Sequence, residues 1–137
     1  MNNLSASGQC LCGSVCFKID MPTNWMAHCH CSMCQKAHGS AFVTWVGVNK
    51  VQVNIDDSDK RLIWFKSSKD AKRGFCSNCG STLFFRSKNW PEELHIARAN
   101  FIESLDRKPQ SHGYYDTHVS WLTVNDDLPK KPECKNK

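Results

Sequence analysis

The sequence predicts a mostly β protein with little helix, and three observations support this fold class. Short β-prone runs recur along the chain, and clusters of Asp, Ser, Asn, Gly and Pro separate them. Only one brief stretch carries clear signals for the start and the end of a helix. Seven of the nine cysteines fall into three tight clusters, which indicates that metal braces the small core of this chain of 137 residues.

The clearest strand is expected at residues 13–19. Val15, Phe17 and Ile19 alternate there with small or polar neighbours, which is the pattern of a half-buried strand. Further β-rich runs lie at residues 41–48, 50–54, 61–66, 81–86 and 94–97. We therefore expect compact, short antiparallel sheets.

The strongest helix signal lies at residues 32–37. Ser32 is the expected N-cap of this short helix, and Gly39 is the residue expected to end it. A weaker helical pattern occurs at residues 100–105. Neither segment is long enough to serve as a scaffold for the fold.

The last eight residues, 130–137, have the composition of a basic tail. They contain four lysines, Pro132 and a single acid, Glu133, a combination that cannot bury a core. We predict one domain at residues 1–129, followed by a disordered tail. The tail accounts for much of the formal net charge of +5, so this charge does not indicate a nucleic-acid partner.

The cysteines favour metal over disulfides. No apolar run is long enough to span a membrane, and residues 1–7 lack the parts of a signal peptide, so we expect a cytoplasmic protein without a membrane partner. Thiols stay reduced in that compartment, where close Cys spacings indicate metal ligands. A disulfide framework would also leave one of the nine cysteines unpaired. The oligomeric state stays open.

Four cysteines in two glycine-flanked pairs predict a closed metal site. They are Cys10, Cys12, Cys76 and Cys79. Gly13 and Gly80 follow the two pairs, and a residue without Cβ enters positive φ without strain where the chain turns around a bound sulfur. Two such corners would complete a tetrahedral four-thiolate site and tie distant strands together.

Cys29, Cys31 and Cys34 predict a second, open site. A helix beginning at Ser32 would place Cys34 in its first turn, where free amides favour a thiolate. Candidates for a fourth ligand are His28, His30, His38, Cys16 and Cys134, of which His38 and Cys16 are favoured. Without a ligand from the chain, the fourth position is left for water or a substrate thiol, as catalytic zinc requires.

Three thiolates favour thiol chemistry over activation of water. A soft, electron-rich zinc ion is a weak Lewis acid that suits a sulfur substrate, and it would hold that substrate as a thiolate able to add to a small aldehyde. Lys36, His38 and Arg73 are candidates for contacting an anionic substrate. Two other functions stay open: a non-catalytic zinc module that binds protein or nucleic acid, and a rubredoxin-like iron site.

Three segments of the chain resemble the signatures of the glutathione-dependent formaldehyde-activating enzyme family, which includes the centromere protein V group. They are Cys10-Leu-Cys12-Gly13-Ser-Val15-Cys-Phe17, Cys29-His-Cys31-Ser-Met-Cys34-Gln-Lys36-Ala-His-Gly39-Ser-Ala-Phe42 and Arg73-Gly-Phe75-Cys76-Ser-Asn-Cys79-Gly80-Ser-Thr-Leu83. The resemblance extends over residues 8–129. Gln35 departs from it, because a basic residue is expected there.

The resemblance implies a compact zinc-stapled β-tent fold and two zinc ions per chain. The first ion would be structural and held by the four glycine-flanked cysteines, and the second would be catalytic and held by Cys29, Cys31 and Cys34. The implied activity is that of a carbon-sulfur lyase, which forms S-(hydroxymethyl)glutathione from glutathione and formaldehyde and also cleaves it. The implied ligands are therefore a small thiol such as glutathione and a small aldehyde.

Overall fold

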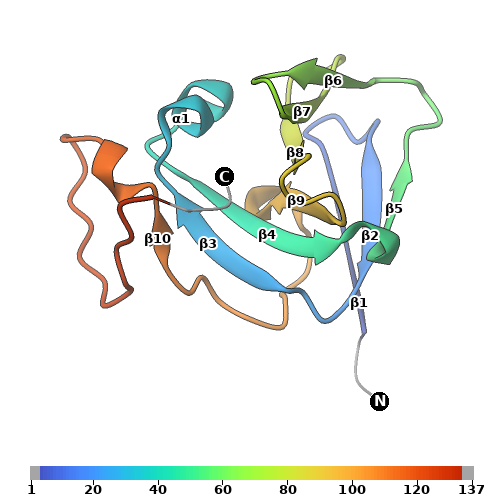
Figure 1. Ribbon diagram of the computed structural model, residues 1–137. Helices are drawn as coiled ribbons and strands as arrows, with labels where there is room; N and C mark the ends of the chain where they lie inside the picture. The colour runs from blue at the N-terminus through green and yellow to red at the C-terminus, as the bar shows by residue number, and fades with distance from the viewer. Residues whose placement is uncertain (1–3, 134–137) are drawn as a thin grey trace.

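Two β-sheets form the framework of the computed structural model, which describes residues 4–133 (Figure 1). The smaller sheet has the order β1-β2-β5, and the larger has the order β10-β3-β4-β9-β8-β7-β6. The strands of the smaller sheet are β1 (Ser5–Gln9), β2 (Cys16–Asp20) and β5 (Val53–Asp56). Those of the larger sheet are β3 (Trp25–Cys29), β4 (Val43–Asn49), β6 (Leu62–Lys66), β7 (Ala71–Cys76), β8 (Thr82–Ser87), β9 (Glu93–Ala97) and β10 (His112–Gly113). The predicted mostly β fold is confirmed.

Strand pairing is antiparallel almost throughout the two sheets. Among strands of the described chain, β3 and β10 alone run parallel, with His112 opposite His28 and Gly113 opposite Cys29. The larger sheet is therefore mixed, whereas the sequence predicts antiparallel sheets. The parallel pair forms because the long segment after β9 returns along the outer edge of β3 (Figure 1).

The main core lies between the smaller sheet and the middle of the larger one. Phe17 on β2 meets Phe84 on β8 edge-on, with 5.6 Å between ring centroids, and Phe101 packs edge-on against Phe17 at 5.0 Å. Ile19 and Ile96 are fully buried in the same cluster. Burial of this apolar surface holds the two sheets together. The alternation predicted for β2 is therefore the pattern that builds the core.

One short α-helix, α1 (Ser32–His38), follows β3 directly. Its N-cap is Cys31 and not the predicted Ser32, because Sγ of Cys31 accepts a hydrogen bond from the amide of Cys34 at 3.3 Å. The helix ends at Gly39 as predicted, where φ is +60° and the amide donates to the carbonyl of Gln35.

Two predicted elements differ from the structure. Residues 50–54 were expected as one strand, but a 3₁₀ turn, η1 (Lys50–Gln52), precedes β5 because the side chain of Gln52 accepts from the amide of Asn49 at 3.0 Å. Residues 100–105 were expected as a weak helix, but the structure has a 3₁₀ turn at η2 (Arg98–Asn100). Phe101 then extends to form a bridge with Gly8, which its packing on the core favours.

Besides the two-residue β10, three strands carry no sequence signal of their own. β1 consists of small and polar residues, β3 ends in His28 and Cys29, and β7 includes Lys72, Arg73 and Gly74. Each of them pairs with a strand whose residues strongly favour the β conformation. This pairing outweighs the weak β propensity of their own residues. A final 3₁₀ turn, η3 (Tyr115–Thr117), follows β10.

The start of the predicted basic tail belongs to the folded structure. The amide of His112 donates to the carbonyl of Pro129, and the amide of Lys131 donates to the carbonyl of His112, both at 2.8 Å. The carbonyl of Lys131 in turn accepts from the amide of Tyr115. Residues 130–132 are thus tied to β10, whereas the sequence predicts disorder from Lys130. The rest of the predicted tail, residues 134–137, lies outside the described residues.

Candidate metal centres and thiol site

Two turns bring four cysteines together at one end of the main core. Cys10 and Cys12 lie in the turn after β1, Cys76 ends β7, and Cys79 lies in the turn that follows. Their sulfur atoms all lie within 4.8 Å of one another. The following glycines, Gly13 and Gly80, have φ values of +83° and +82°. The positive φ expected from the Cys-Gly pattern is confirmed at both corners.

The spacing of these sulfur atoms fits a tetrahedral zinc ion. Sγ of Cys12 lies 3.7 Å from Sγ of Cys10 and 3.7 Å from Sγ of Cys76. Four ligands at the zinc to sulfur distance of 2.3 Å are separated by about 3.8 Å along the edges of a tetrahedron. No disulfide joins the eight described cysteines. The four thiols can therefore hold a metal ion with little rearrangement.

The surroundings of this group favour thiolates at its exposed side. Hydrogen bonds with Ser14 and Asn78 lower the pKa of the Cys12 thiol to about 5. Burial opposes ionisation of Cys79, but hydrogen bonds with Ser81 outweigh it and lower the pKa to about 7. Burial raises the pKa of Cys76 to about 11. Metal binding would supply the positive charge that this buried thiolate needs.

The other three clustered cysteines meet where β3 joins α1. Cys29 ends β3, Cys31 caps α1, and Cys34 lies in the first turn of α1. Their sulfur atoms lie within 4.8 Å of one another, and Sγ of Cys34 is 3.6 Å from Sγ of Cys29. All three are buried, and the spacing again matches an edge of a thiolate tetrahedron. The predicted triad is therefore assembled around one point.

Within residues 4–133, no fourth Cys, His, Asp or Glu joins this triad. Sγ of Cys16 donates to the carbonyl of Gly13 near the other cysteine group, and Cys134 lies outside the described residues. His28 and His30 instead approach His112, as described below. The ring of His38 contacts Trp45 edge-on at 5.3 Å. The donor set of the described chain is thus three sulfurs, which leaves a position for a ligand from outside.

Cys34 has two nitrogen donors besides its sulfur neighbours. Nε1 of Trp45 donates to its Sγ at 3.4 Å, and the guanidinium of Arg73 lies at 3.6 Å from the same atom. Arg73 is only 4% exposed and lies over the ring of Phe85 at 5.0 Å. A buried cation requires a negative partner, so this arrangement favours a thiolate at Cys34. The sequence suggests Arg73 as a surface contact for an anion, whereas the structure places it inside.

Two cavities reach the triad from different sides. One of about 510 Å³ is lined by Cys29 and by Trp25, Trp45, Trp90 and other residues. A smaller one of about 190 Å³ is lined by Cys31, Arg73 and Lys69, among others. Tyr114 lines both. The first offers an aromatic wall and the second offers positive charge beside the same group of thiols.

A histidine and a glutamate lie in the aromatic cavity. Nε2 of His95 is 2.9 Å from Oε1 of Glu93, and the ring of His95 stacks on Phe85 with 5.5 Å between centroids. The hydrogen bond with His95 lowers the pKa of Glu93. Sequence reasoning did not single out this pair, because both residues belong to a short strand and neither has a motif around it.

Two of the three residues predicted to contact substrate, Lys36 and His38, lie elsewhere on α1. Lys36 is exposed and lines two other cavities, one with Gln35 and Trp121 and one that includes Arg73. Neither Lys36 nor His38 lines the cavities that reach Cys29 and Cys31. Gln35 donates to the carbonyls of His30 at 2.8 Å and Thr117 at 3.0 Å, so it joins α1 to the segment after β10.

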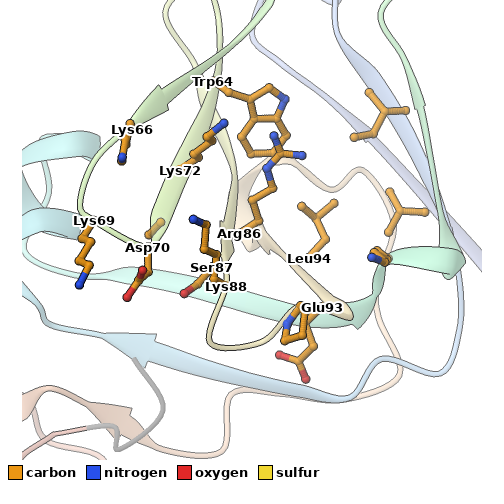
Figure 2. Close-up of a pocket in the computed structure, with 15 residues that line it drawn as sticks. Trp64, Lys66, Lys69, Asp70, Lys72, Arg86, Ser87, Lys88, Glu93 and Leu94 are labelled. Atoms are coloured by element: carbon orange, nitrogen blue, oxygen red, sulfur yellow. The ribbon is translucent and has the colours of Figure 1, made fainter.

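A cavity of about 640 Å³ lies between the edges of the two sheets, and none of the clustered cysteines lines it. Figure 2 shows Lys66, Lys72 and Arg86 around Trp64. The guanidinium of Arg86 lies over the indole at 4.1 Å, and the ring of Phe84 stacks against Trp64. The groove is basic, and none of its residues belongs to a group of described residues that could hold a metal ion.

Comparison with known proteins finds one family whose sequence model matches this chain. The family model described as glutathione-dependent formaldehyde-activating enzyme matches residues 5–117. A Halomonas elongata protein provisionally named as such an enzyme is 25% identical over 124 residues, which are 85% of this chain and 79% of that protein. An uncharacterised lyase of Schizosaccharomyces pombe is 32% identical over 129 residues, covering 87% of this chain and 91% of that protein.

A solved structure shares the fold. The crystal structure of a Rhodobacter sphaeroides protein superposes with a TM-score of 0.60 and 21% sequence identity. The match covers 73% of this chain and 90% of that chain. Within the described residues, the structure has no helix of the length and apolar character needed to cross a membrane.

Proposed function

Because the chain belongs to the glutathione-dependent formaldehyde-activating enzyme family, we propose that it is a zinc-dependent carbon-sulfur lyase. Its reaction would join glutathione and formaldehyde into S-(hydroxymethyl)glutathione and split the same adduct. The observation that carries this proposal is the buried group of Cys29, Cys31 and Cys34, which two cavities approach. The thiol sulfur bonds to the aldehyde carbon, and the aldehyde oxygen receives a proton.

We propose two zinc ions per chain, one in each cysteine group. The four-cysteine group is saturated by its own sulfurs and has a structural role. The triad supplies three sulfurs, and zinc bound there would hold a substrate thiol as its thiolate. Reduced thiols are needed in both groups, which favours a location in the cytoplasm.

The residues around Cys34 balance the negative charge of the triad. Arg73 and Trp45 both direct N–H groups at Sγ of Cys34. Charge-assisted contacts of this kind stabilise the thiolate over the thiol. Arg73 therefore has two roles in the proposal, as a counter-charge for the triad and as the cationic wall of the smaller cavity.

The two cavities suit different parts of the substrates. Glutathione is an anion with a flexible peptide skeleton, and its carboxylates suit the smaller cavity, where the charges of Lys69 and Arg73 outweigh that of Asp70. The aldehyde suits the cavity walled by Trp25, Trp45 and Trp90, whose apolar rings shield the reacting carbon from water on their side.

His95 is the proposed carrier of the proton. It lies in the aromatic cavity together with Cys29, and Glu93 orients its ring through the 2.9 Å contact. An imidazole held this way can give a proton to the oxygen of the adduct and take it back in the reverse reaction. A His95→Gln variant should therefore lose turnover while glutathione still binds.

Exchange spectroscopy by NMR tests the activity. The zinc-loaded protein should accelerate interconversion of glutathione and S-(hydroxymethyl)glutathione above the spontaneous rate, and Cys31→Ser should abolish the effect with loss of one zinc. Cys16→Ser is the matched control, because Cys16 belongs to neither cysteine group. A protein that holds both zinc ions and leaves the exchange rate unchanged would refute the proposal.

A non-catalytic binding module is the second candidate, and the basic groove around Trp64 favours it. Six lysines and arginines and two acids line this groove, which suits an anionic partner. This function predicts salt-sensitive binding of a polyanion that Arg86→Gln weakens and Cys31→Ser leaves unchanged. The lyase predicts the opposite dependence on these two variants.

A further inference from the structure

A third group of possible metal donors lies at the edge of the larger sheet. His28 on β3, His112 on β10 and Asp126 from the C-terminal segment each bring one donor atom within 4.8 Å of the others. The group contains no sulfur and is separate in composition from both cysteine groups. Side chains alternate along a strand, so His28 and Cys29 leave opposite faces of β3.

Strand register places the two histidines side by side. β10 pairs with β3 in parallel with His112 opposite His28, and the two rings lie 4.9 Å apart with 32° between their planes. Asp126 reaches the same point because the amide of Leu128 donates to its Oδ1 at 3.1 Å. The chain then returns to β10, where the carbonyl of Pro129 accepts from the amide of His112. Three distant parts of the sequence are thus held at one place.

The remaining ring nitrogens already have contacts that orient the imidazoles. Nδ1 of His28 lies 2.8 Å from Oγ1 of Thr44, and Nδ1 of His112 lies 2.8 Å from Nε2 of His30. The Nε2 atoms of His28 and His112 would then be the metal donors, and Nε2 of His112 already faces the carboxylate of Asp126. Metal-binding histidines are typically oriented by such a contact through the second nitrogen.

The short distances within the group fit coordination. Nε2 of His112 lies 3.0 Å from Oδ1 and 2.9 Å from Oδ2 of Asp126. Neighbouring nitrogen and oxygen ligands at about 2.1 Å from one ion are separated by about 3.0 to 3.4 Å, depending on whether the site is octahedral or tetrahedral. A small movement of the partly exposed Asp126 would admit an ion between the three side chains.

We propose that His28, His112 and Asp126 form a third metal site, for a divalent transition ion such as zinc, nickel or cobalt. Two imidazoles and one carboxylate are a donor set that these ions accept, with positions left for water. The site lies beside η3 and the returning segment at residues 130–132, so a bound ion would lock the C-terminal segment onto β3 and β10. The proposal does not rest on the lyase activity, although His28 also lines the aromatic cavity.

The alternative is that Asp126, His112 and His30 form only a chain of hydrogen bonds. Equilibrium dialysis of the protein with its thiol sites already loaded with zinc, against added Ni²⁺ or Co²⁺, separates the two. We expect one further ion per chain. With Co²⁺, the added ion should show weak visible bands without sulfur-to-metal charge transfer, and it should broaden the ring NMR signals of His28 and His112.

Two variants and one matched control locate the ion. Asp126→Asn keeps an acceptor for His112 and Leu128, so the fold is retained while the carboxylate is lost, and His28→Gln removes one imidazole. Each should weaken binding of the third ion at least about tenfold. Asp127→Asn removes the same charge from an exposed neighbouring position and should leave binding unchanged. Binding that stops at the thiol sites, or a third ion that survives in both variants, would overturn the proposal.

Discussion

The guanidinium of Arg73 lies 3.6 Å from Sγ of Cys34 through Nη1 and 3.7 Å through Nη2, although 39 positions separate the two residues. β7 supplies the arginine and the first turn of α1 supplies the cysteine. This contact places a buried positive charge beside the triad that sequence reasoning assigned to metal. It gives the first prediction.

Replacing Arg73 by Gln should lower the rate of the proposed reaction about 10- to 100-fold. A charge-assisted hydrogen bond contributes about 1.5 to 3 kcal/mol, and each 1.4 kcal/mol is a factor of ten. The measurement is the exchange rate at saturating formaldehyde, with zinc content and melting temperature recorded for the same sample. Arg86→Gln, on the basic groove, is the control that should keep the wild-type rate. If wild type and Arg73→Gln have equal rates, Arg73 does not balance the charge of the triad.

The two cysteine groups should differ in their contribution to stability. Cys12 and Cys76 are 64 positions apart, so a metal ion at that group cross-links distant turns, whereas the triad lies within one short segment. Loss of a cross-link closing a loop of that length costs about 3 kcal/mol or more. Cys76→Ser should therefore lower the free energy of unfolding by about that amount, and Cys31→Ser by much less. Denaturant unfolding measures both, and similar losses would contradict the division into structural and open sites.

The turn after Cys79 depends on a glycine because of its backbone conformation. Gly80 has φ +82°, and a Cβ added there would meet no atom within 4 Å. Gly80→Ala should thus destabilise the protein through strain alone, by about 1 kcal/mol or more. Gly80→Asn should recover part of this loss, because Asn tolerates positive φ better than Ala. If thermal unfolding ranks the two variants in the reverse order, crowding and not φ controls this position.

Acidification should destabilise the fold through His30. Burial, followed by the nearby His112 and His28, lowers the pKa of His30 from 6.5 to about 4. The unfolded chain then binds more protons in this range, so the contribution to stability is complete above pH 6.5 and is lost as pH falls toward 4. The hydrogen bond with His112 also lowers the pKa of Asp126 below 3.8, which adds a further loss under more acidic conditions.

Urea unfolding at several pH values tests this sign. His30→Gln should give a flatter dependence of the free energy of unfolding between pH 6.5 and 4 than the wild-type protein. His118→Ala should flatten the slope only slightly, because His118 follows burial, His112 and His28 among the causes that lower the pKa of His30. Acid also releases metal from every variant. Because the free energies of unfolding are compared at the same pH, this shared effect cancels in their difference. A slope that His30→Gln leaves intact would assign the acid sensitivity to other groups.

Much of the candidate site could be predicted from the sequence because its donors are local. Cys29, Cys31 and Cys34 lie within six positions, and consecutive Cα atoms are 3.8 Å apart, so the chain itself keeps their sulfurs near one another. The pairs around Gly13 and Gly80 were predicted from the same kind of evidence. The end of α1 at Gly39 followed from the conformational freedom of glycine.

Weak strands could not be predicted, because their own residues do not favour the β conformation. β1 forms a strand because it pairs with β2, and β7 forms a strand because it pairs with β6 and β8. The same pairing decides which side chains reach the triad. Arg73 belongs to β7, and no local pattern distinguishes it from an exposed arginine.

The sequence by itself determined the mostly β class, the two cysteine groups and the turns that shape them, because short spacing and local backbone preference act without the rest of the chain. Only the tertiary structure decided that Arg73 faces Cys34, that His95 shares a cavity with Cys29, and that His112 meets His28 and Asp126. These contacts join residues many positions apart. Strand register and burial set them, and both are properties of the whole fold.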